Sequence, residues 1–287
     1  MGKTITHDII ICPKCKDSGF SIESALLKCS NCHETYGRSG DKLFFFEYPD
    51  DGASNLLDKL KVKMKKYNSL YDFLIFLVSP VCVMNMGVKK FIREYINGKD
   101  VVAFNIGAGN TNLHENITNI DLHKYNNVDM TADILNLPVK NDSVDVIMNI
   151  AVLEHVSSPE KAVMEFHRIL KDGGVVYCYF PFMQGLHASP FDCSRRTLEG
   201  MRILFKDWEI LEIRDATGPT SGFLWVFQEY FAILFSFGIK PLYSLLHLFI
   251  MLVTFPLKFL DILLIRHPMG KNISSGYMVI ARKRNRV

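Results

Sequence analysis

The sequence predicts an α/β protein with a doubly wound parallel sheet, and two stretches carry this prediction. An apolar run at 101–106 leads into Gly107 and Gly109, which is how a buried strand ends in a loop that approaches a ligand closely. A second apolar run, 117–120, ends at Asp121, a carboxylate placed to accept hydrogen bonds from a ribose diol. Because parallel strands gather such features at one edge of a sheet, both are expected at a site for a nucleotide-like ligand.

The glycine loop discriminates between two nucleotide-like cofactors. A dinucleotide site favours G-x-G-x-x-G, in which the third glycine lets a helix pack closely beneath a pyrophosphate. Here Asn112 stands at that third position after Gly107 and Gly109. S-adenosylmethionine (SAM) has no pyrophosphate and requires only a close backbone approach, so the loop favours SAM over NAD. A plain strand-to-helix turn is the alternative without a ligand.

Further motifs follow the glycine loop within residues 101–214. They are Asp121, Asp133, Leu137-Pro138, 142–145, 153–155 and 167–174. In order and spacing this segment resembles the class I SAM-dependent methyltransferases of type 11, in particular those of bacterial surface-polysaccharide gene clusters. The resemblance implies a Rossmann-like, seven-stranded methyltransferase sheet. Only eleven residues separate Gly109 from Asp121, so the first helix is predicted to be very short.

The resemblance also implies which residues hold SAM. Asp121 would hold the ribose, Asp133 would reach the adenine amino group, and Ile134 would lie beside the adenine ring. Asn105 and Thr111 stand where the family often has an acidic residue and a third glycine, but Asn105 can still hydrogen-bond the methionine ammonium. The expected cofactor-binding set is Asn105, Gly107, Gly109, Asp121, Leu122, Asp133, Ile134 and Asn149.

Two C-x-x-C pairs near the amino terminus predict a metal site. Cys12 and Cys15 are separated from Cys29 and Cys32 by thirteen residues, and two such knuckles complete a closed tetrahedral zinc site. Redox-active thiols are the alternative. Four thiolates leave no open position on a metal, so the zinc is expected to be structural. Residues 8–48 resemble the zinc ribbons that activate certain tRNA and protein methyltransferases.

The chain divides into three predicted parts. Residues 1–48 form the zinc ribbon, 49–98 form a linker and amino-terminal helices, and 99–287 form the methyltransferase domain. The helices either close over the substrate or simply pack on the core. The net charge of +3 over 287 residues gives no case for a nucleic-acid partner. The first residues do not resemble a secretory signal peptide, so the chain is expected in the cytoplasm.

The segment 153–155 is the first candidate for chemistry at the methyl acceptor. The resemblance places this Leu-Glu-His segment by the methyl group, which makes His155 or Glu154 a candidate base. Many relatives use this histidine only to hold the loop through hydrogen bonds, and that is the structural alternative.

The segment 181–197 is the second candidate. It matches the His-x-x-Pro-x-Asp-x-x-Arg-x-Thr pattern of the polysaccharide-cluster methyltransferases. His187 would act as a base oriented by Asp192, and Arg195 would bind an anionic group. The structural alternative is that Asp192 and Arg195 pair only to fix the loop.

A largely apolar insertion, 222–266, interrupts the predicted hairpin of strands six (206–214) and seven (275–283). Its uncharged run of seventeen residues, 241–257, is at the lower limit for a membrane span. Because both flanking strands belong to one sheet, the insertion must return to the side that it left. A hairpin that lies in or dips into the inner leaflet is favoured. Helices buried against the domain or a second subunit, and two complete spans, are the alternatives.

These features predict a SAM-dependent methyltransferase that modifies a hydroxyl or carboxyl group of a glycan precursor or lipid-linked small molecule. Peripheral contact with the cytoplasmic face of the membrane is expected, and a homodimer is a further expectation. The alternative function is a non-catalytic SAM-binding scaffold close to the membrane. An NAD oxidoreductase is the third hypothesis.

Overall fold

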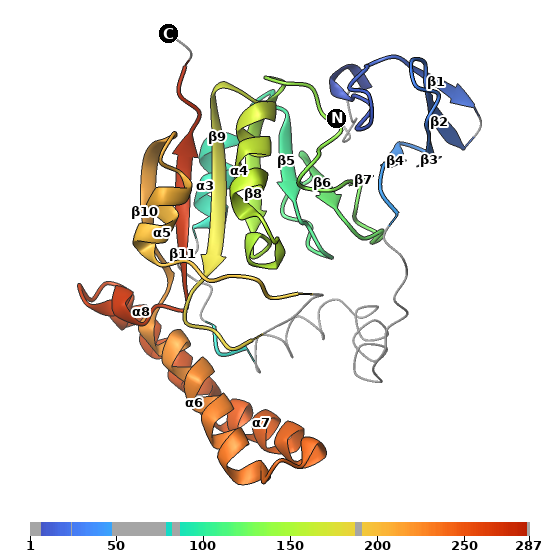
Figure 1. The fold of residues 1–287 in the computed structure, drawn as a ribbon. Coiled ribbons are helices and arrows are strands. Elements are labelled where there is room, and N and C mark those ends of the chain that lie inside the picture. The colour runs from blue at the N-terminus through green and yellow to red at the C-terminus, as the bar shows by residue number, and fades with distance from the viewer. Residues whose placement is uncertain (1–6, 24, 48–78, 82–86, 187–190, 286–287) are drawn as a thin grey trace.

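The structure, a computed structural model of the 287-residue chain, describes residues 7–23, 25–47, 79–81, 87–186 and 191–285. The predicted amino-terminal helices between 49 and 78, Cys82 and the candidate base His187 lie outside the described residues. The described part is a sheet with helices on both faces, joined to a cysteine-bearing ribbon and to a pair of long helices that projects from the sheet (Figure 1).

Within the described residues, eleven strands form one continuous mixed sheet in the order β1-β2-β3-β4-β7-β6-β5-β8-β9-β11-β10. The strands are β1 (Phe20–Glu23), β2 (Leu26–Cys29), β3 (Thr35–Ser39), β4 (Lys42–Phe44), β5 (Ala103–Ile106), β6 (Ile117–Asp121), β7 (Met130–Thr131), β8 (Val144–Ile150), β9 (Leu170–Pro181), β10 (Glu209–Thr217) and β11 (Gly276–Arg282). The part of the sheet from β7 to β10 contains the strands β5 to β11. If these are renumbered 1 to 7 in chain order, with β5 as strand 1, their order in the sheet is 3-2-1-4-5-7-6. The first five of these strands are parallel, and β11 runs antiparallel to β9 and β10. The prediction of a Rossmann-like α/β fold is confirmed by this arrangement.

Two apolar cores, one on each face of the sheet, hold the flanking helices. These helices are α3 (Val88–Tyr95), α4 (Pro159–Ile169) and α5 (Leu198–Leu204). Phe91 of α3 packs in the core that contains Tyr177, and Phe166 of α4 packs in the other core. Successive strand residues point to opposite faces, so β5 supplies Ala103 to the first core and Phe104 to the second. Both faces of the central strands are therefore buried.

The connection between β5 and β6 differs from the prediction of a very short helix. Residues 107–116, all of them described, contain no helix. Side-chain amides hold this connection instead: Asn119 Nδ2 donates to Asn112 Oδ1 at 3.1 Å, and Asn127 Nδ2 donates to the Gly109 and Thr111 carbonyls at 3.0 and 3.1 Å. The prediction was wrong because these carboxamides satisfy the backbone without helical hydrogen bonds.

The ribbon continues the sheet, which the sequence did not indicate. Strand β4 pairs in parallel with β7, and the Leu43 and Phe45 amides donate to the Asp129 and Thr131 carbonyls at 3.0 Å each. The two-residue strand β7 would otherwise form an exposed edge, which proteins usually cover. Within the described residues, the ribbon and the doubly wound part of the sheet are thus joined into one larger sheet.

The apolar insertion forms a helical hairpin between β10 and β11. Its elements are α6 (Pro219–Ser236), α7 (Lys240–Thr254), η4 (Phe255–Leu260) and α8 (Asp261–Leu264), and the remaining short helices are η1 (His7–Ile9), η3 (Leu153–His155) and η5 (Gly270–Asn272). The turn between the helices places Phe237 and Gly238 in the left-handed region, with φ of 49° and 76°. Among the described residues, one helical segment, Lys240–Leu264, is long and apolar enough to cross a membrane, and 17% of its most apolar 18-residue window is buried.

Strand six is displaced by three residues from its predicted position, since β10 spans Glu209–Thr217 instead of 206–214. The Trp208 amide donates to the Phe205 carbonyl at 3.1 Å, and the two aromatic rings lie 5.7 Å apart. This turn packs Trp208 into the core before the strand begins.

Replacing Leu43 by alanine tests whether the ribbon and the doubly wound part of the chain unfold as one unit. Leu43 is fully buried at the junction, so L43A is expected to lower the free energy of unfolding by about 2–5 kcal/mol. Denaturant unfolding in a Trp225→Phe background, where Trp208 is the remaining tryptophan, should show the same shift by far-UV circular dichroism and by Trp208 fluorescence. The control Ile22→Ala, at an exposed position of β1, should have little effect. A Trp208 transition that stays in place in L43A would mean that the ribbon folds independently.

Candidate functional site

A cavity of about 410 Å³ opens at the carboxyl ends of β5, β6 and β7, beside the loop that follows β8. The strand order reverses between β5 and β8, which is where doubly wound sheets bind ligands. This cavity is lined by seven of the site residues that the sequence predicted: Gly107, Gly109, Asp121, Leu122, Asp133, Ile134 and His155. The volume lies within the range of pockets that bind small molecules.

Asp121 fixes the glycine loop to the end of β6. Its Oδ2 accepts the Gly109 amide at 2.7 Å and its Oδ1 accepts the His123 amide at 2.9 Å. The Gly107 and Ala108 amides both donate to the Ile120 carbonyl, at 2.8 and 3.1 Å. A carboxylate offers about four lone pairs, so each Asp121 oxygen retains an acceptor site toward the cavity.

The two glycines of the loop are required for different reasons. Gly107 has φ +77°, and a Cβ there would lie 2.2 Å from Val152 Cγ2 in the loop after β8. Gly109 has φ +52°, but a Cβ there would meet nothing within 4 Å. The close approach that the sequence predicted at Gly107 is therefore made by Val152, and Gly109 faces open space.

Asp133 and Ile134 form the wall of the cavity after β7. Asp133 Oδ1 accepts the Leu135 amide at 2.9 Å, which closes a tight turn and leaves Oδ2 available. Ile134 contributes apolar surface beside it. An acceptor next to an apolar side chain suits a flat heterocycle that carries an amino group.

His123 and Tyr125 also line the cavity, and the sequence analysis missed them. Their rings lie 5.8 Å apart in the loop that follows Asp121. Burial, followed by the Asp121 charge, raises the pKa of Tyr125, so its hydroxyl stays protonated near neutral pH. Two aromatic residues within four positions of the carboxylate that ends β6 were the available sequence signal.

Asn105 and Asn149 lie behind the cavity instead of lining it. Asn105 Nδ2 donates to Asn119 Oδ1 at 3.2 Å, and Asn149 Nδ2 donates to the Ile106 carbonyl at 2.9 Å. Both side chains are buried. Asn149 Oδ1 is buried without a hydrogen-bond partner among the described residues. In this structure the two carboxamides support the backbone of the glycine loop.

His155 lies where the cavity meets the loop that carries Phe191. Its Nδ1 is 2.5 Å from the Phe191 carbonyl oxygen. A carbonyl can only accept, so Nδ1 carries the proton of this contact, and Nε2 lies 3.8 Å from Oε1 of the buried Glu154 carboxylate. The Glu154 carbonyl accepts the Cys193 amide at 2.7 Å and the Ser194 amide at 3.2 Å, which fixes the two loops together.

Asp192 and Arg195 form a bidentate ion pair beside this loop and do not line the cavity. Arg195 Nη2 lies 2.6 Å from Asp192 Oδ2, Arg195 Nη1 pairs with the other carboxylate oxygen, and Nη2 also donates to the Gly185 carbonyl at 3.2 Å. The arrangement matches the structural alternative in which the pair fixes the loop. His187, the predicted base of this motif, lies outside the described residues.

Four cysteine thiols converge in the ribbon, which continues the sheet beyond β7. The Sγ atoms of Cys12, Cys15, Cys29 and Cys32 all lie within 4.8 Å of one another, with Cys12–Cys32 at 3.6 Å and Cys15–Cys29 at 3.5 Å. A tetrahedral zinc ion with Zn–S bonds of about 2.3 Å holds its sulfurs about 3.8 Å apart. The thiol positions therefore fit a four-coordinate metal with little adjustment.

Local geometry prepares these thiols for a metal. Lys16 and His33, which follow the second cysteine of each knuckle, have φ of 64° and 58°, and these left-handed residues turn each knuckle back on itself. The Asp17 amide lowers the pKa of the Cys15 thiol to about 7, which favours the thiolate that binds metal. The Tyr36 hydroxyl lies 3.1 Å from Cys12 Sγ and can donate to it.

The first cysteine knuckle contacts the wall of the cavity. Asn136 Nδ2 donates to the Pro13 carbonyl at 3.2 Å, and Lys16 Nζ donates back to Asn136 Oδ1. The Ile11 amide donates to the Pro138 carbonyl at 3.1 Å. A shallow hollow between knuckle and wall is lined by Lys14 and Asp133. The cysteine cluster therefore supports the same turn that presents Asp133 to the cavity.

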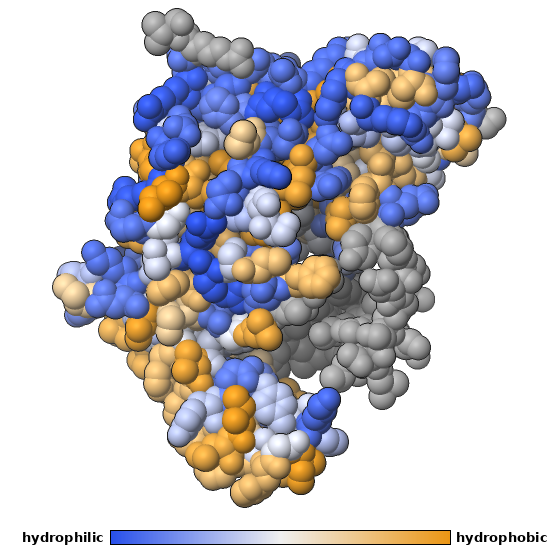
Figure 2. Space-filling model, in the orientation of Figure 1, coloured by the Kyte–Doolittle hydropathy of each residue, from blue (hydrophilic) through white to orange (hydrophobic). Residues whose placement is uncertain are grey.

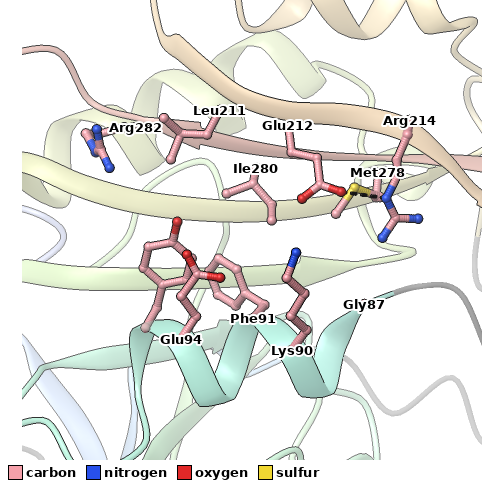
Figure 3. A pocket seen from close by; sticks show the side chains of 11 residues that line it. Gly87, Lys90, Phe91, Glu94, Leu211, Glu212, Arg214, Met278, Ile280 and Arg282 are labelled. Atoms are coloured by element: carbon pink, nitrogen blue, oxygen red, sulfur yellow. Dashed lines mark hydrogen bonds and ion pairs between the residues drawn. The ribbon is translucent and has the colours of Figure 1, made fainter.

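A second hollow of about 270 Å³ lies between α3 and strands β10 and β11 (Figure 3). Its floor is apolar, with Phe91 and Ile280, and charged side chains surround it. Arg214 Nε pairs with Glu212 Oε1 at 2.6 Å across one side. No predicted site residue lines this hollow, and the candidate site is the cavity at the strand ends.

Paired glycine substitutions test the geometry of the loop. Gly107→Ala is expected to lower the thermal midpoint strongly and to disrupt the cavity, because the added Cβ overlaps Val152. Gly109→Ala should cost only the left-handed strain, about 1–2 kcal/mol. The double variant Gly107→Ala/Val152→Ala should regain part of the lost stability. Equal effects of the two single variants, measured by differential scanning calorimetry, would contradict the close approach.

Comparison with known proteins identifies the kind of domain that contains this cavity. Residues 88–178, from α3 into β9, match the family model described as a methyltransferase domain. A protein of Encephalitozoon cuniculi (strain GB-M1), provisionally described as a methyltransferase, is 40% identical over 51 residues. That match covers 17% of this chain, and the chain spans only 24% of the relative's length.

Several solved structures are similar to this chain at low sequence identity. The [4+2]-cyclase SpnF is 17% identical, with a TM-score of 0.43 over 69% of this chain and 79% of the cyclase. A sarcosine dimethylglycine methyltransferase, provisionally assigned, from Galdieria sulphuraria is 15% identical, with a TM-score of 0.43 over 70% and 84% of the two chains. A third structure is a complex of the Haloferax volcanii Trm112 methyltransferase activator with a provisionally assigned methyltransferase. Its sequence identity to this chain is 12%, and its TM-score is 0.45 over 83% of this chain and all of that chain. The family match covers residues 88–178 of the 287, and the strand order is that of a Rossmann-like sheet.

Proposed function

We propose that this protein transfers a methyl group from SAM to a hydroxyl or carboxyl group of a glycan precursor or a lipid-linked small molecule. The observation that carries the proposal is the single cavity wall formed by Gly109, Asp121, Asp133 and Ile134 at the point where the strand order reverses. We place the protein in the cytoplasm, since the six described cysteines are free thiols and four of them are arranged as metal ligands. We also propose that the protein forms a homodimer and that it has no nucleic-acid partner.

The residues of the cavity fit the parts of SAM. Asp121 has acceptor capacity left for a ribose diol after it has bound two backbone amides. Asp133 Oδ2 would accept from the adenine amino group, and Ile134 would pack on the ring. The charge of Asp121 and the ring of Tyr125 also give the cavity groups that favour a cation. SAM supplies the electrophilic methyl group of its sulfonium when bound.

The protein's own task is to align the acceptor and to exclude water. His155 would take the proton of a hydroxyl acceptor at Nε2, which lies 3.8 Å from the buried Glu154 carboxylate, while the Phe191 carbonyl holds Nδ1. A carboxylate acceptor would need no base. The Asp192–Arg195 pair would hold the 191–195 loop in place, and Phe191 would cover the cavity.

A non-catalytic SAM-binding scaffold is the alternative function. Asn105 and Thr111 favour it, because they replace the acidic residue and the glycine that the resemblance leads one to expect. Asn105 is buried against Asn119, so it does not offer the ligand a substitute group. The intact Asp121 and Asp133 favour the enzyme.

We further propose that the four thiolates hold a structural zinc ion. A set of four thiolates is closed to water and substrate, so the ion would stabilise the fold without taking part in the reaction. The ion would fix the ribbon strands that continue the sheet at β7.

SAM binding and turnover test the enzymatic proposal. Titration calorimetry should show SAM binding that Asp121→Asn weakens by about ten- to a hundredfold, because a charge-assisted hydrogen bond is lost. Asp207→Asn, at an exposed position outside the cavity, is the matched control. Labelled SAM should methylate a component of glycan or lipid extracts, and Asp121→Asn should reduce this transfer in parallel.

Two outcomes would contradict the proposal. SAM binding without transfer to any extract component would assign the scaffold function. Binding of NADH in place of SAM would assign an oxidoreductase.

Removal of the metal tests the ribbon. Purified protein should contain one zinc ion per chain, and Cys29→Ser should lose it, while Cys193→Ser, at an exposed cysteine outside the cluster, should keep it. Without zinc, the Leu43 and Phe45 amides should exchange faster with deuterium, and SAM affinity should fall because the Asn136 turn is released. Unchanged exchange and unchanged affinity in metal-free protein would contradict a structural role.

A further inference from the structure

The α6–α7 hairpin exposes an unusually large apolar surface. Large apolar side chains on it are half exposed or more at these positions: Val226, Tyr230, Ile233, Phe235, Phe237, Ile239, Leu245, Phe249, Val253, Ile262 and Leu263. Thr254 is the one buried residue of α7, and every other residue of that helix is partly or fully exposed. The space-filling view shows apolar side chains covering the projecting end of the hairpin (Figure 2). Soluble monomers rarely expose apolar patches of this extent.

Several polar side chains of the hairpin lie in the seam between α6 and α7 and contact one another, while Gln228 Oε1 and His247 Nε2 are buried there without a hydrogen-bond partner among the described residues. Tyr243 Oη donates to Glu229 Oε2 at 2.5 Å, and His247 Nε2 lies 3.8 Å from Glu229 Oε1. Gln228 Nε2 donates to Thr254 Oγ1 at 2.8 Å. These contacts connect α6 to α7 across their common seam. The hairpin is therefore polar inside and apolar outside, which is the reverse of a helix pair made for water.

Backbone groups and charges at the base of the hairpin are also satisfied by protein. Asp261 accepts the Thr220 and Ser221 amides at 2.7 and 2.8 Å, so it caps the start of α6. Lys258 is buried, and its Nζ donates to the Ser79 carbonyl at 3.1 Å. A chain that enters a low-dielectric medium must satisfy its polar groups internally in this way.

The base of the hairpin is basic where it meets solvent. Arg266, His267 and Lys271 follow α8 within a few residues, and all three are exposed. Within 223–265, Lys240 at the turn is the one charged residue that is exposed. Cations beside an apolar surface complement the anionic headgroups of a bilayer.

The predicted alternative was an insertion buried against its own domain or a second subunit; the exposed residues of α7 contradict the first part for the described residues, and the second part stays a prediction. The hairpin projects from the sheet, and of the residues that the structure describes it touches those outside the insertion chiefly at its base (Figure 1). There Gly222 packs against the Ile273 carbonyl, where a Cβ would lie at 2.0 Å. Gly218 packs against Asp261, where a Cβ would lie at 2.2 Å from Cγ. The hairpin is a fixed projection, and its apolar sides need another partner.

We propose that the α6–α7 hairpin enters the near leaflet of a lipid bilayer that contains anionic lipid and anchors the protein there. A bilayer covers all the exposed sides of α7 and the turn at once. A symmetric second copy would cover one patch and leave the opposite side exposed. The exposed Lys240 disfavours a complete crossing, because its charge would have to pass through the hydrocarbon core.

The anchor is connected to the loop beside the cavity. Trp225 and Glu229 of α6 pack on Gly185, where a Cβ would lie 3.4 Å from atoms of both side chains. The Gly185 carbonyl accepts from Arg195 of the Asp192–Arg195 pair. If the proposed methyl transfer holds, this contact places the acceptor side of the cavity next to the leaflet. The anchor itself does not depend on that reaction.

Flotation with vesicles tests the anchor. The full chain is mixed, without SAM, with vesicles of phosphatidylcholine and phosphatidylglycerol and is expected to float with them. Phe249→Glu/Val253→Glu should weaken the partition at least tenfold, because it places two charges on an exposed apolar face of α7. Met164→Glu/Ile203→Glu is the matched control, since these apolar residues are equally exposed but lie on α4 and α5. In Phe237→Trp, brominated lipids should quench the new tryptophan at the turn.

Three results would overturn the anchor. They are a wild-type chain that stays with the soluble fraction, equal partition of the hairpin and control variants, and a vesicle-free dimer that Phe249→Glu/Val253→Glu converts to a monomer. The dimer would assign the hairpin to a second copy of the chain. Zinc content and SAM affinity, measured on each variant, verify folding. Flotation without SAM binding would reject the proposed reaction and leave the anchor intact.

Discussion

The short connection between β5 and β6 is the constraint on which the cavity depends. Parallel strands usually require a crossover of a dozen residues or more, commonly a helix, but residues 107–116 must make this one. Hydrogen bonds from side chains therefore replace those of a helix. Asp121 accepts the Gly109 amide, and Asn127 donates to the carbonyls of the same loop. The carboxylate that the ligand is expected to use is thus also the group that holds the loop in shape.

A second consequence concerns the edge of the sheet. Strand β7 has two residues, which is too few to form a stable edge, yet the turn after it carries Asp133. The ribbon strand β4 pairs with β7, and the first cysteine knuckle holds Asn136 three residues beyond Asp133. The cysteine cluster therefore acts on the cavity through the backbone that it supports. Fusion of the ribbon to the domain makes this support permanent.

The opposite end of the domain shows how polarity can be reversed within one chain. The central sheet has apolar residues inside and polar residues outside, whereas the α6–α7 hairpin pairs Glu229 with Tyr243 inside and exposes residues such as Phe249. Both arrangements satisfy the same requirement, that polar groups have partners in a medium that cannot supply them. The contact of α6 with Gly185 joins this second environment to the loop beside the cavity.

The sequence by itself determined the Rossmann-like fold and the convergence of four cysteines. It also determined that carboxylates, Asp121 and Asp133, stand at or just after the ends of two strands. These features depend on local patterns, namely alternating apolar runs, glycine positions and cysteine spacing, which act over a few residues. Only the tertiary structure decided that Asn105 and Asn149 lie behind the loop, and that β4 extends the sheet through β7. It also decided that the hairpin stands away from its domain. These outcomes depend on contacts between residues far apart in the chain, and no local pattern encodes which distant surfaces will meet.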